Sequence, residues 1–346
     1  MAHEITERDG LFTVREPAWH GLGVVLNDYP SIKEAKQLVH PWEPVSEPVY
    51  RKIPVVHSHT SECTEDCQLW VTEEYQEIPE FKAVVRDDAR DGSTLGVVGD
   101  NYELVHNSDM YEIAEAIEGE ADSGSVMLET GGSLKGGKKV WLLLRLRDPL
   151  RVKGDPNGDV ILYYAIQNSH DSTISFRGQA TMTRIVCDNT AQAADLDARS
   201  RGTEFSFRHT KNIQDKIEGA KAALRGWRES IENYQLQMNH LIGISVTNEI
   251  KEEFVSRFIP YPLAEIVTER VRENVSKSQQ VFWDIIDGQT CEGIDDTAYG
   301  LVQASVEYLN HGRRTHTNTT RFTRNYLTRD KIVEKAVALV NELAGV

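Results

Sequence analysis

Four side chains that commonly bind zinc, His57, His59, Cys63 and Cys67, lie within one short segment of the chain. Two imidazoles and two thiolates form the ligand set of a closed, tetrahedral structural zinc site. The spacing departs from that of a standard zinc finger, which carries its two ligand pairs on separate elements. Three interpretations therefore stay open: a structural zinc site, a redox pair of Cys63 and Cys67, or an exposed acidic loop.

The glycine-rich stretch TGGSLKGGKK at residues 130–139 is a second candidate. It sets Lys135, Lys138 and Lys139 beside flexible backbone, an arrangement that can hold phosphate groups. As a plain turn between two strands it needs no ligand.

Motifs of the common enzyme classes are missing from the chain. It contains no G-x-S-x-G, no H-E-x-x-H, no G-x-x-x-x-G-K-[ST] and no helix-opening G-x-G-x-x-G. The histidines at positions 20, 106, 170 and 209 follow no spacing that places an acid beside a base. We therefore favour a protein without catalytic activity, and keep an enzyme acting on nucleotides or nucleic acid as an alternative.

Basic side chains alternate with apolar ones along two expected strands. Residues 140, 142, 144 and 146 are apolar and share one face of the first strand, whereas Trp141, Leu143, Arg145 and Arg147 share the other. Arg177 and Arg184 belong to the second strand. Guanidinium groups contact phosphates and an exposed aromatic ring stacks on bases, so this face is a candidate surface for single-stranded nucleic acid.

A second basic group lies in residues 311–331, which contain six Lys or Arg and one Asp. The arginines that we expect to contact nucleic acid are Arg313, Arg314, Arg321 and Arg324. Hydroxyl and aromatic residues interleave with them, as suits a loop that follows a nucleic-acid backbone. The alternative is a solvated connector whose arginines pair with acidic residues of the same chain.

The charge of the chain is unevenly distributed. The 346 residues carry 38 basic and 54 acidic side chains, and residues 1–130 hold 27 of the acidic but only 9 of the basic ones. This acidic first third either keeps the protein soluble or shields a basic surface made later in the chain. No apolar run approaches the roughly 18 residues of a membrane span, and the first residues lack a signal-peptide pattern, so we expect a cytoplasmic protein.

The hydrophobic pattern predicts an α+β protein in three parts. Residues 1–78 are rich in proline and read as an irregular acidic region that contains the possible zinc loop at 57–67. Residues 79–210 read as a sheet domain, an antiparallel β-meander with one flanking helix. Its expected strands cover 81–86, 95–98, 102–106, 126–130, 138–147, 160–167 and 173–186, with the helix at 109–118.

Residues 211–346 read as helical. Apolar residues recur at alternating spacings of four and three over 213–241, which predicts one long heptad-patterned helix. This seam either packs against the other C-terminal helices or joins subunits into a homo-oligomer. Further helices are expected at 248–258, 263–274, 278–286, 297–310 and 329–343.

Several segments resemble a phage/plasmid-like protein family that is catalogued as a domain of unknown function. They are AWHGLG (18–23), YELVHN (102–107), RIVCDNT (184–190), the HT pair at 209–210 and YGLVQASVEYLNH (299–311). The resemblance implies a gene carried by phages, prophages or plasmids, and a bacterial host cell. The order of strand, helix, meander and helix is also similar to the Red-beta and Erf single-strand annealing recombinases, which implies DNA binding without metal or nucleotide.

Together these features favour a non-enzymatic DNA-binding protein of phage-type recombination or replication, with single-stranded DNA as its partner. The alternative from another class is an acidic interaction protein with structural zinc, which either imitates DNA or binds a basic host protein.

Overall fold

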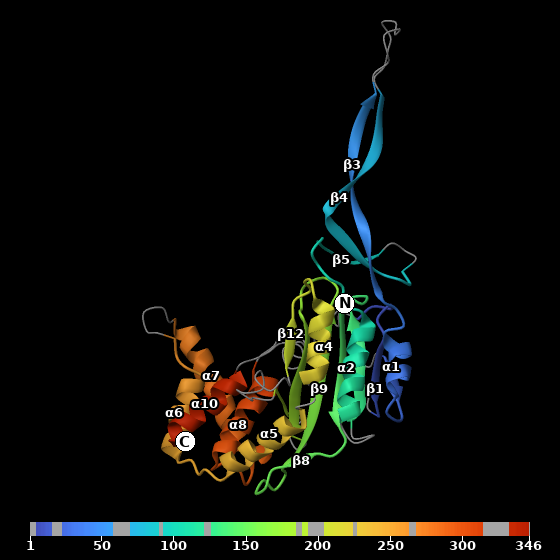
Figure 1. Cartoon of the computed structure of the whole chain (residues 1–346). Coiled ribbons are helices and arrows are strands. Elements are labelled where there is room, and N and C mark those ends of the chain that lie inside the picture. The colour runs from blue at the N-terminus through green and yellow to red at the C-terminus, as the bar shows by residue number, and fades with distance from the viewer. Residues whose placement is uncertain are drawn as a thin grey trace, which may run out of the picture.

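The computed structural model describes residues 5–15, 23–57, 70–89, 93–120, 126–184, 189–192, 204–223, 227–262, 268–313 and 332–345. It shows a mixed α+β protein with a large sheet, a smaller antiparallel sheet that projects from one end, and a helical lobe beside the large sheet (Figure 1). Among the helices within these ranges, none is long and apolar enough to cross a membrane.

An antiparallel meander forms most of the large sheet, as the sequence predicts. The strand order is β11-β10-β9-β7-β6-β1-β2. The meander strands are β6 (Val126–Leu134), β7 (Lys139–Leu146), β9 (Asp159–Ser169), β10 (Phe176–Arg184) and β11 (Asn189–Gln192). The short strands β1 (Leu11–Val14) and β2 (Val24–Leu26) pair in parallel and make the sheet mixed, while β8 (Leu150–Arg151) pairs with β9 and β12 (Phe205–Phe207) with β10.

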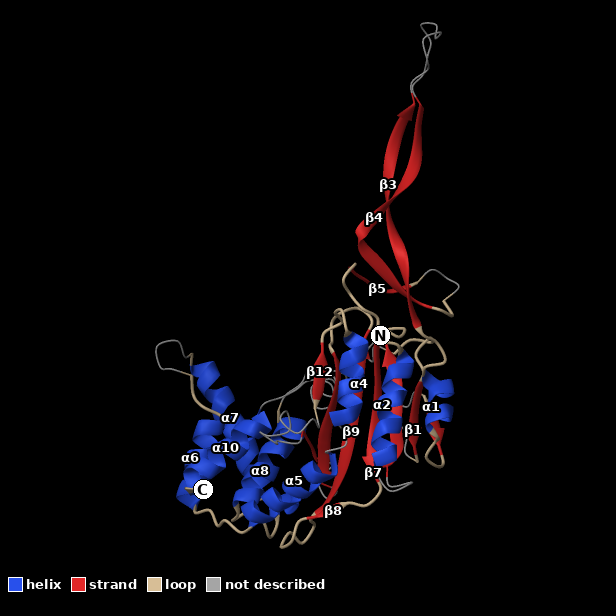
Figure 2. Ribbon diagram, in the orientation of Figure 1, coloured by secondary structure: helices blue, strands red, loops and turns tan. Residues whose placement is uncertain are grey.

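Three helices cover one face of this sheet: α1 (Ile32–Val39), α2 (Asn107–Glu120) and α4 (Ile213–Ala223) (Figure 2). The alternation expected in β7 is confirmed in part: Leu142 and Leu144 are buried in the main core below these helices, but Trp141 and Leu143 on the other face are buried as well. Ile213, Ile217 and Ala220 of α4 enter the same core, and α4 packs against α2. The first helix of the expected helical region therefore belongs to the layer that covers the sheet.

The heptad pattern of residues 213–241 spans two separate helices, α4 and α5 (Trp227–Ile242). In Figure 1, α4 runs alongside α2, whereas α5 lies at the lower end of the sheet beside α8. Met238 and Leu241, at the end of the pattern, are buried in the core of the same chain. The described ends of the seam thus serve packing within one molecule.

The helical lobe surrounds one buried helix, α8 (Ala298–Glu307), in which residues 298–306 are all buried. Its other elements are α6 (Asn248–Phe258), α7 (Glu269–Ile286), η4 (Gln289–Cys291), η5 (Tyr308–Gly312) and α10 (Ile332–Ala344). Phe254, Phe258, Phe282 and Tyr308 pack together with ring centroids 5.4–6.4 Å apart.

A long β-hairpin occupies part of the region expected to be irregular. β3 (Pro44–His57) pairs with β4 (Trp70–Arg86), and β5 (Thr94–Gly99) joins β4 only at the base. Prolines are tolerated here because β3 is an edge strand that needs hydrogen bonds on one side only, and Pro48 stands at a register shift. We call residues 50–57 and 70–77, which pair with each other alone, the arm; it projects from the body of the molecule (Figure 1).

Candidate functional site

The glycine-rich segment forms the tight turn between β6 and β7. Lys135, Gly136 and Gly137 all have positive φ angles, of 58°, 75° and 101°. A Cβ atom on Gly137 would lie 2.6 Å from the Trp42 ring, so both the backbone conformation and the close approach require glycine there. The interpretation as a turn is therefore confirmed, and the question becomes what its polar groups bind.

The carboxylate of Asp9 occupies the concave side of this turn. Its Oδ2 accepts hydrogen bonds from the backbone N–H of Gly136 (2.9 Å) and from the N–H and hydroxyl of Thr6 (2.7 and 2.8 Å). Its Oδ1 accepts from the N–H of Gly137 (2.9 Å) and the hydroxyl of Ser133 (2.8 Å). Successive N–H groups of this kind form an anion-binding nest. Here the anion in the nest is a side chain of the protein itself.

A cavity of about 820 Å³ lies next to the turn, where the N-terminal segment meets β5. Its cationic side chains are Arg8, Lys135 and Lys138. The remaining residues that line it are Ile5, Thr6, Glu7, Asp9, Gly23, Ser93, Thr94, Leu95 and Gly136. Three cations with hydroxyl groups between them are the side chains that proteins use for phosphate oxygens.

The electrostatic balance of the cavity favours anions. Two acidic side chains, Glu7 and Asp9, oppose the three cations, and five donors without charge hold the Asp9 carboxylate in the turn. Lys138 is half-buried, and its ammonium group forms no ion pair with any described residue. Arg8 is held in place because it donates to the hydroxyl of Ser93. The partly buried Lys138 attracts a phosphate more strongly than a fully hydrated cation, whereas Arg8 and Lys135 are exposed.

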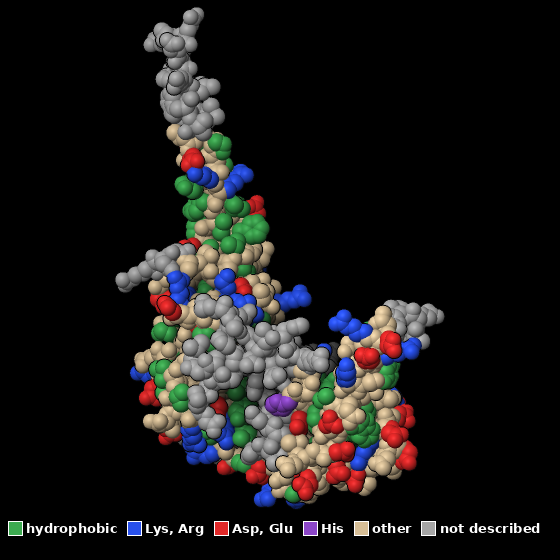
Figure 3. All heavy atoms as spheres, turned by 180° about the vertical axis from the view of Figure 1, so that it is seen from behind, with side chains coloured by type: hydrophobic (Ala, Val, Ile, Leu, Met, Phe, Trp, Pro, Cys, Tyr) green, Lys and Arg blue, Asp and Glu red, His purple; other side chains and the backbone are tan. Residues whose placement is uncertain are grey.

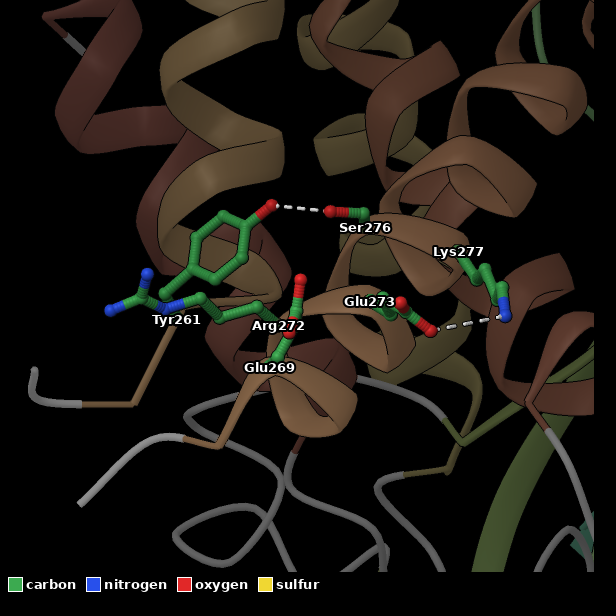
Figure 4. Close-up of a pocket in the computed structure, with 6 residues that line it drawn as sticks. All are labelled: Tyr261, Glu269, Arg272, Glu273, Ser276 and Lys277. Atoms are coloured by element: carbon green, nitrogen blue, oxygen red, sulfur yellow. Dashed lines mark hydrogen bonds and ion pairs between the residues drawn. The ribbon is translucent and has the colours of Figure 1, made fainter.

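A second cavity, of about 780 Å³, lies at the start of α7 (Figure 4). Its lining residues are Tyr261, Glu269, Arg272, Glu273, Ser276 and Lys277. The Tyr261 and Ser276 hydroxyls are hydrogen-bonded at 2.8 Å, and Lys277 lies 3.9 Å from Glu273. Two acidic and two basic side chains balance each other, so this cavity offers little net attraction for an anion.

Two of the arginines predicted on the sheet face, Arg145 and Arg177, have partners within the protein. Trp141, Gln167 and Arg177 form one row across β7, β9 and β10, and Arg177 donates to the Gln167 side chain at 3.1 Å. Burial lowers the pKa of the Arg177 guanidinium. Trp141 is only 6% exposed, which leaves little of its ring for stacking on a base.

Arg145 lies further along β7, four residues and therefore about 13 Å from Trp141. It donates to the hydroxyl of Tyr29 (2.9 Å) and lies 3.4 Å from the carboxylate of Glu129. Arg147 follows β7 and is exposed. The sheet thus brings Trp141 and Arg177 into one row, but leaves Arg145 and Arg147 apart from them.

Other predicted site residues lie at the limits of the described ranges. Arg184 is the last residue of β10, and Arg313 is exposed directly after η5. Arg314, Arg321 and Arg324 lie outside the described residues, as do His59, Cys63 and Cys67, while His57 ends β3. Within the described ranges, no group of three or more His, Cys, Asp or Glu residues is arranged to hold a metal ion.

Residues 102–106, expected to form a strand, have no regular secondary structure and instead join a buried polar network. The Tyr102 hydroxyl donates to the Ser169 carbonyl at 2.9 Å, and its ring stacks on His209 with centroids 4.5 Å apart. The Asn107 side chain links the Trp42 carbonyl (2.8 Å) to His170 Nε2 (3.1 Å). The YELVHN segment therefore connects α2 to the sheet and to the residues that precede the hairpin.

His40, whose ring lies against that of Trp42, has a defined tautomer. Its Nε2 lies 2.9 Å from the Gly132 carbonyl, which can only accept, so Nε2 carries the proton. Its Nδ1 therefore accepts from the Tyr111 hydroxyl at 2.8 Å. Burial lowers the pKa of His40 to about 4 and that of His170 to about 3, so both are neutral at pH 7. These histidines hold elements together and form no acid–base pair.

Comparison with protein families identifies the chain at family level. A family model described as a domain of unknown function, DUF932, matches residues 94–334. The chain belongs to the DUF932 family. No curated protein and no solved structure gives a significant match. The DUF932 region includes Lys135, Lys138 and the buried helix α8, whereas Arg8, Asp9 and most of the hairpin precede it.

Sequence reasoning found the lysines of the cavity but missed Arg8 and Asp9. The signal in the sequence that could have indicated a partner such as Asp9 was the turn itself. A glycine-rich turn without a phosphate-binding motif has backbone N–H donors that need an acceptor. Nothing local to Asp9 marks it as that acceptor. The membership of DUF932 confirms the resemblance to a family of unknown function, while the phage origin and the similarity to annealing recombinases stay predictions.

Proposed function

We propose that the protein is a non-enzymatic DNA-binding protein that takes the backbone of single-stranded DNA into the cavity beside the β6–β7 turn. The observation that carries this proposal is the gathering of Arg8, Lys135 and Lys138 around one cavity. Phosphate contacts supply most of the affinity of sequence-independent DNA binding.

The shape of the site favours a single strand over a duplex. A duplex presents its phosphates on a rigid convex surface, whereas a single strand can turn one phosphate and its nucleotide into a cavity. The overall charge of −16 also repels a duplex more strongly, because its phosphates are denser. A role in phage-type recombination or replication extends this proposal.

The test is a titration of fluorescently labelled oligo(dT) with the full chain, followed by anisotropy at several salt concentrations. Three phosphate contacts predict that log K falls with log salt with a slope of about −2. The double variant Lys135→Gln with Lys138→Gln should weaken binding at low salt by about tenfold or more, because each lost contact is a charged hydrogen bond.

The matched control is Lys153→Gln with Lys211→Gln, which removes the same charge from exposed positions outside the cavity. It should change the affinity by less than about twofold. Equal losses in the two double variants, or no anisotropy change at micromolar protein and low salt, would contradict the proposal.

A further inference from the structure

The arm exposes large aromatic side chains far from the core. Tyr50 is 51% and Tyr75 71% exposed, and Phe81 and Val97 at its base are 50% and 59% exposed. The space-filling view shows hydrophobic side chains along the projecting hairpin (Figure 3). A two-stranded ribbon without a third strand or a helix against it is marginally stable in water. The arm therefore exposes apolar surface that a partner can cover, and binding a partner would stabilise it.

The strand register places both tyrosines on one face, which we call the tyrosine face. Tyr50 pairs with Glu77 and Lys52 pairs with Tyr75, and these positions alternate with Arg51 and Gln76 on the opposite face. Tyr50 and Tyr75 are therefore diagonal neighbours across the ladder. Diagonal residues lie about 7–8 Å apart, a distance that aromatic side chains can span.

The charges around the tyrosine face are mainly negative. Lys52 is paired with Glu73, and Arg51 donates to Gln76, so the two nearest cations already have partners. By contrast, the carboxylates of Glu74, Glu77 and Glu80 form no ion pair within the described part of the chain. Glu77 lies on the tyrosine face and Glu74 on the opposite one.

We propose that the tyrosine face docks a Lys- or Arg-rich segment of a protein partner. A cation above Tyr50 or Tyr75 gains a cation–π contact, and Glu77 beside them supplies the opposite charge. DNA does not suit this face, because the charged group without an ion pair there is the Glu77 carboxylate. A second copy of the chain does not suit it either. Each copy would contribute two carboxylates, Glu73 and Glu77, but only one cation, Lys52, so two facing copies would repel each other. This proposal is independent of the DNA site.

The experiment uses the full-length protein and a fluorescein-labelled octapeptide of alternating Arg and Val, which is long enough to lie along the arm. An octapeptide of alternating Glu and Val is the charge control. We expect Glu77→Gln and Tyr75→Ala each to weaken binding of the basic peptide by about fivefold, through loss of the ion pair and of the cation–π contact. Tyr75→Phe should keep most of the affinity, because the ring remains.

The matched control is Glu74→Gln, the same change on the same strand but on the opposite face. It should weaken binding by less than about twofold. Equal losses in Glu74→Gln and Glu77→Gln would mean unspecific attraction to an acidic surface and would overturn the proposal. So would the absence of binding at millimolar peptide, or dimers in sedimentation that Tyr75→Ala dissociates, since a second copy would then be the occupant.

Discussion

The buried histidines His40 and His170 link acidity to stability. Burial holds their folded-state pKa values at about 4 and about 3, below the ordinary value of 6.5 that applies when the chain unfolds. As the pH falls, these histidines therefore bind protons in the unfolded chain at a higher pH than in the folded protein. Their neutral forms contribute stability that is complete above pH 6.5 and is lost as the pH falls through 6.5 towards 4 and 3.

We expect the free energy of unfolding to fall by about 3 kcal/mol between pH 6.5 and pH 5, about 1.6 kcal/mol for each histidine. Urea denaturation at a series of pH values measures this slope. In His170→Asn the amide does not titrate, so about half of the slope should disappear even though the variant is less stable at pH 7. An unchanged slope in His170→Asn would refute the assignment.

At the scale of single elements, the segment YGLVQASVEYLNH that carries the family resemblance forms α8 and η5. Gly300 lies against the turn that precedes α8, because a Cβ atom there would be 2.0 Å from the Ile294 carbonyl oxygen. Thr297 caps the helix by accepting from the Gly300 N–H at 3.0 Å. Since α8 is buried on all sides, it cannot move away to make room.

Gly300→Ala should therefore destabilise the protein by about 3 kcal/mol or more, through overpacking against backbone. The control is Gly219→Ala in α4, an exposed helix position with open space around it. There alanine should stabilise by up to about 1 kcal/mol, because it restricts the unfolded chain. The midpoints of urea unfolding measure both changes, and a neutral Gly300→Ala would show that the turn can shift.

At the scale of the whole molecule, the sheet and the helical lobe share one core. A continuous cluster of buried residues includes Leu142 of the sheet, Ile217 of α4 and Tyr299 of α8. The helix α4 follows the expected border near residue 210 and packs against α2 and β12, which precede that border. The described residues on both sides of that border are thus joined by apolar contacts.

A shared core predicts that residues 79–210 and 211–346 unfold together. Scanning calorimetry of the full chain should show one transition for both parts, with a van't Hoff enthalpy close to the calorimetric one. The substitution Gly300→Ala in the lobe should shift this whole transition. Two resolved transitions, of which only one responds to Gly300→Ala, would show instead that the lobe unfolds by itself.

Much of the architecture was predictable because it depends on local periodicity. Alternation in β7 identified Leu142 and Leu144 as core residues, and the period of α6 placed that helix at residues 248–258, as observed. The hairpin was missed because proline discourages strands in general, while an edge strand tolerates it. The break between α4 and α5 was missed because a heptad pattern does not reveal which neighbour each part of it meets.

The β6–β7 turn with its lysines could be predicted from the sequence, since glycine-rich segments favour tight turns. The partners of these groups depend on contacts between distant parts of the chain. Asp9, 127 residues from Gly136, fills the turn, and Tyr29, 116 residues from Arg145, accepts from its guanidinium. Hydrogen bonds and ion pairs act over a few ångströms in space without regard to sequence separation. Which cations face the cavity, and which already have partners, was therefore settled by the folded arrangement.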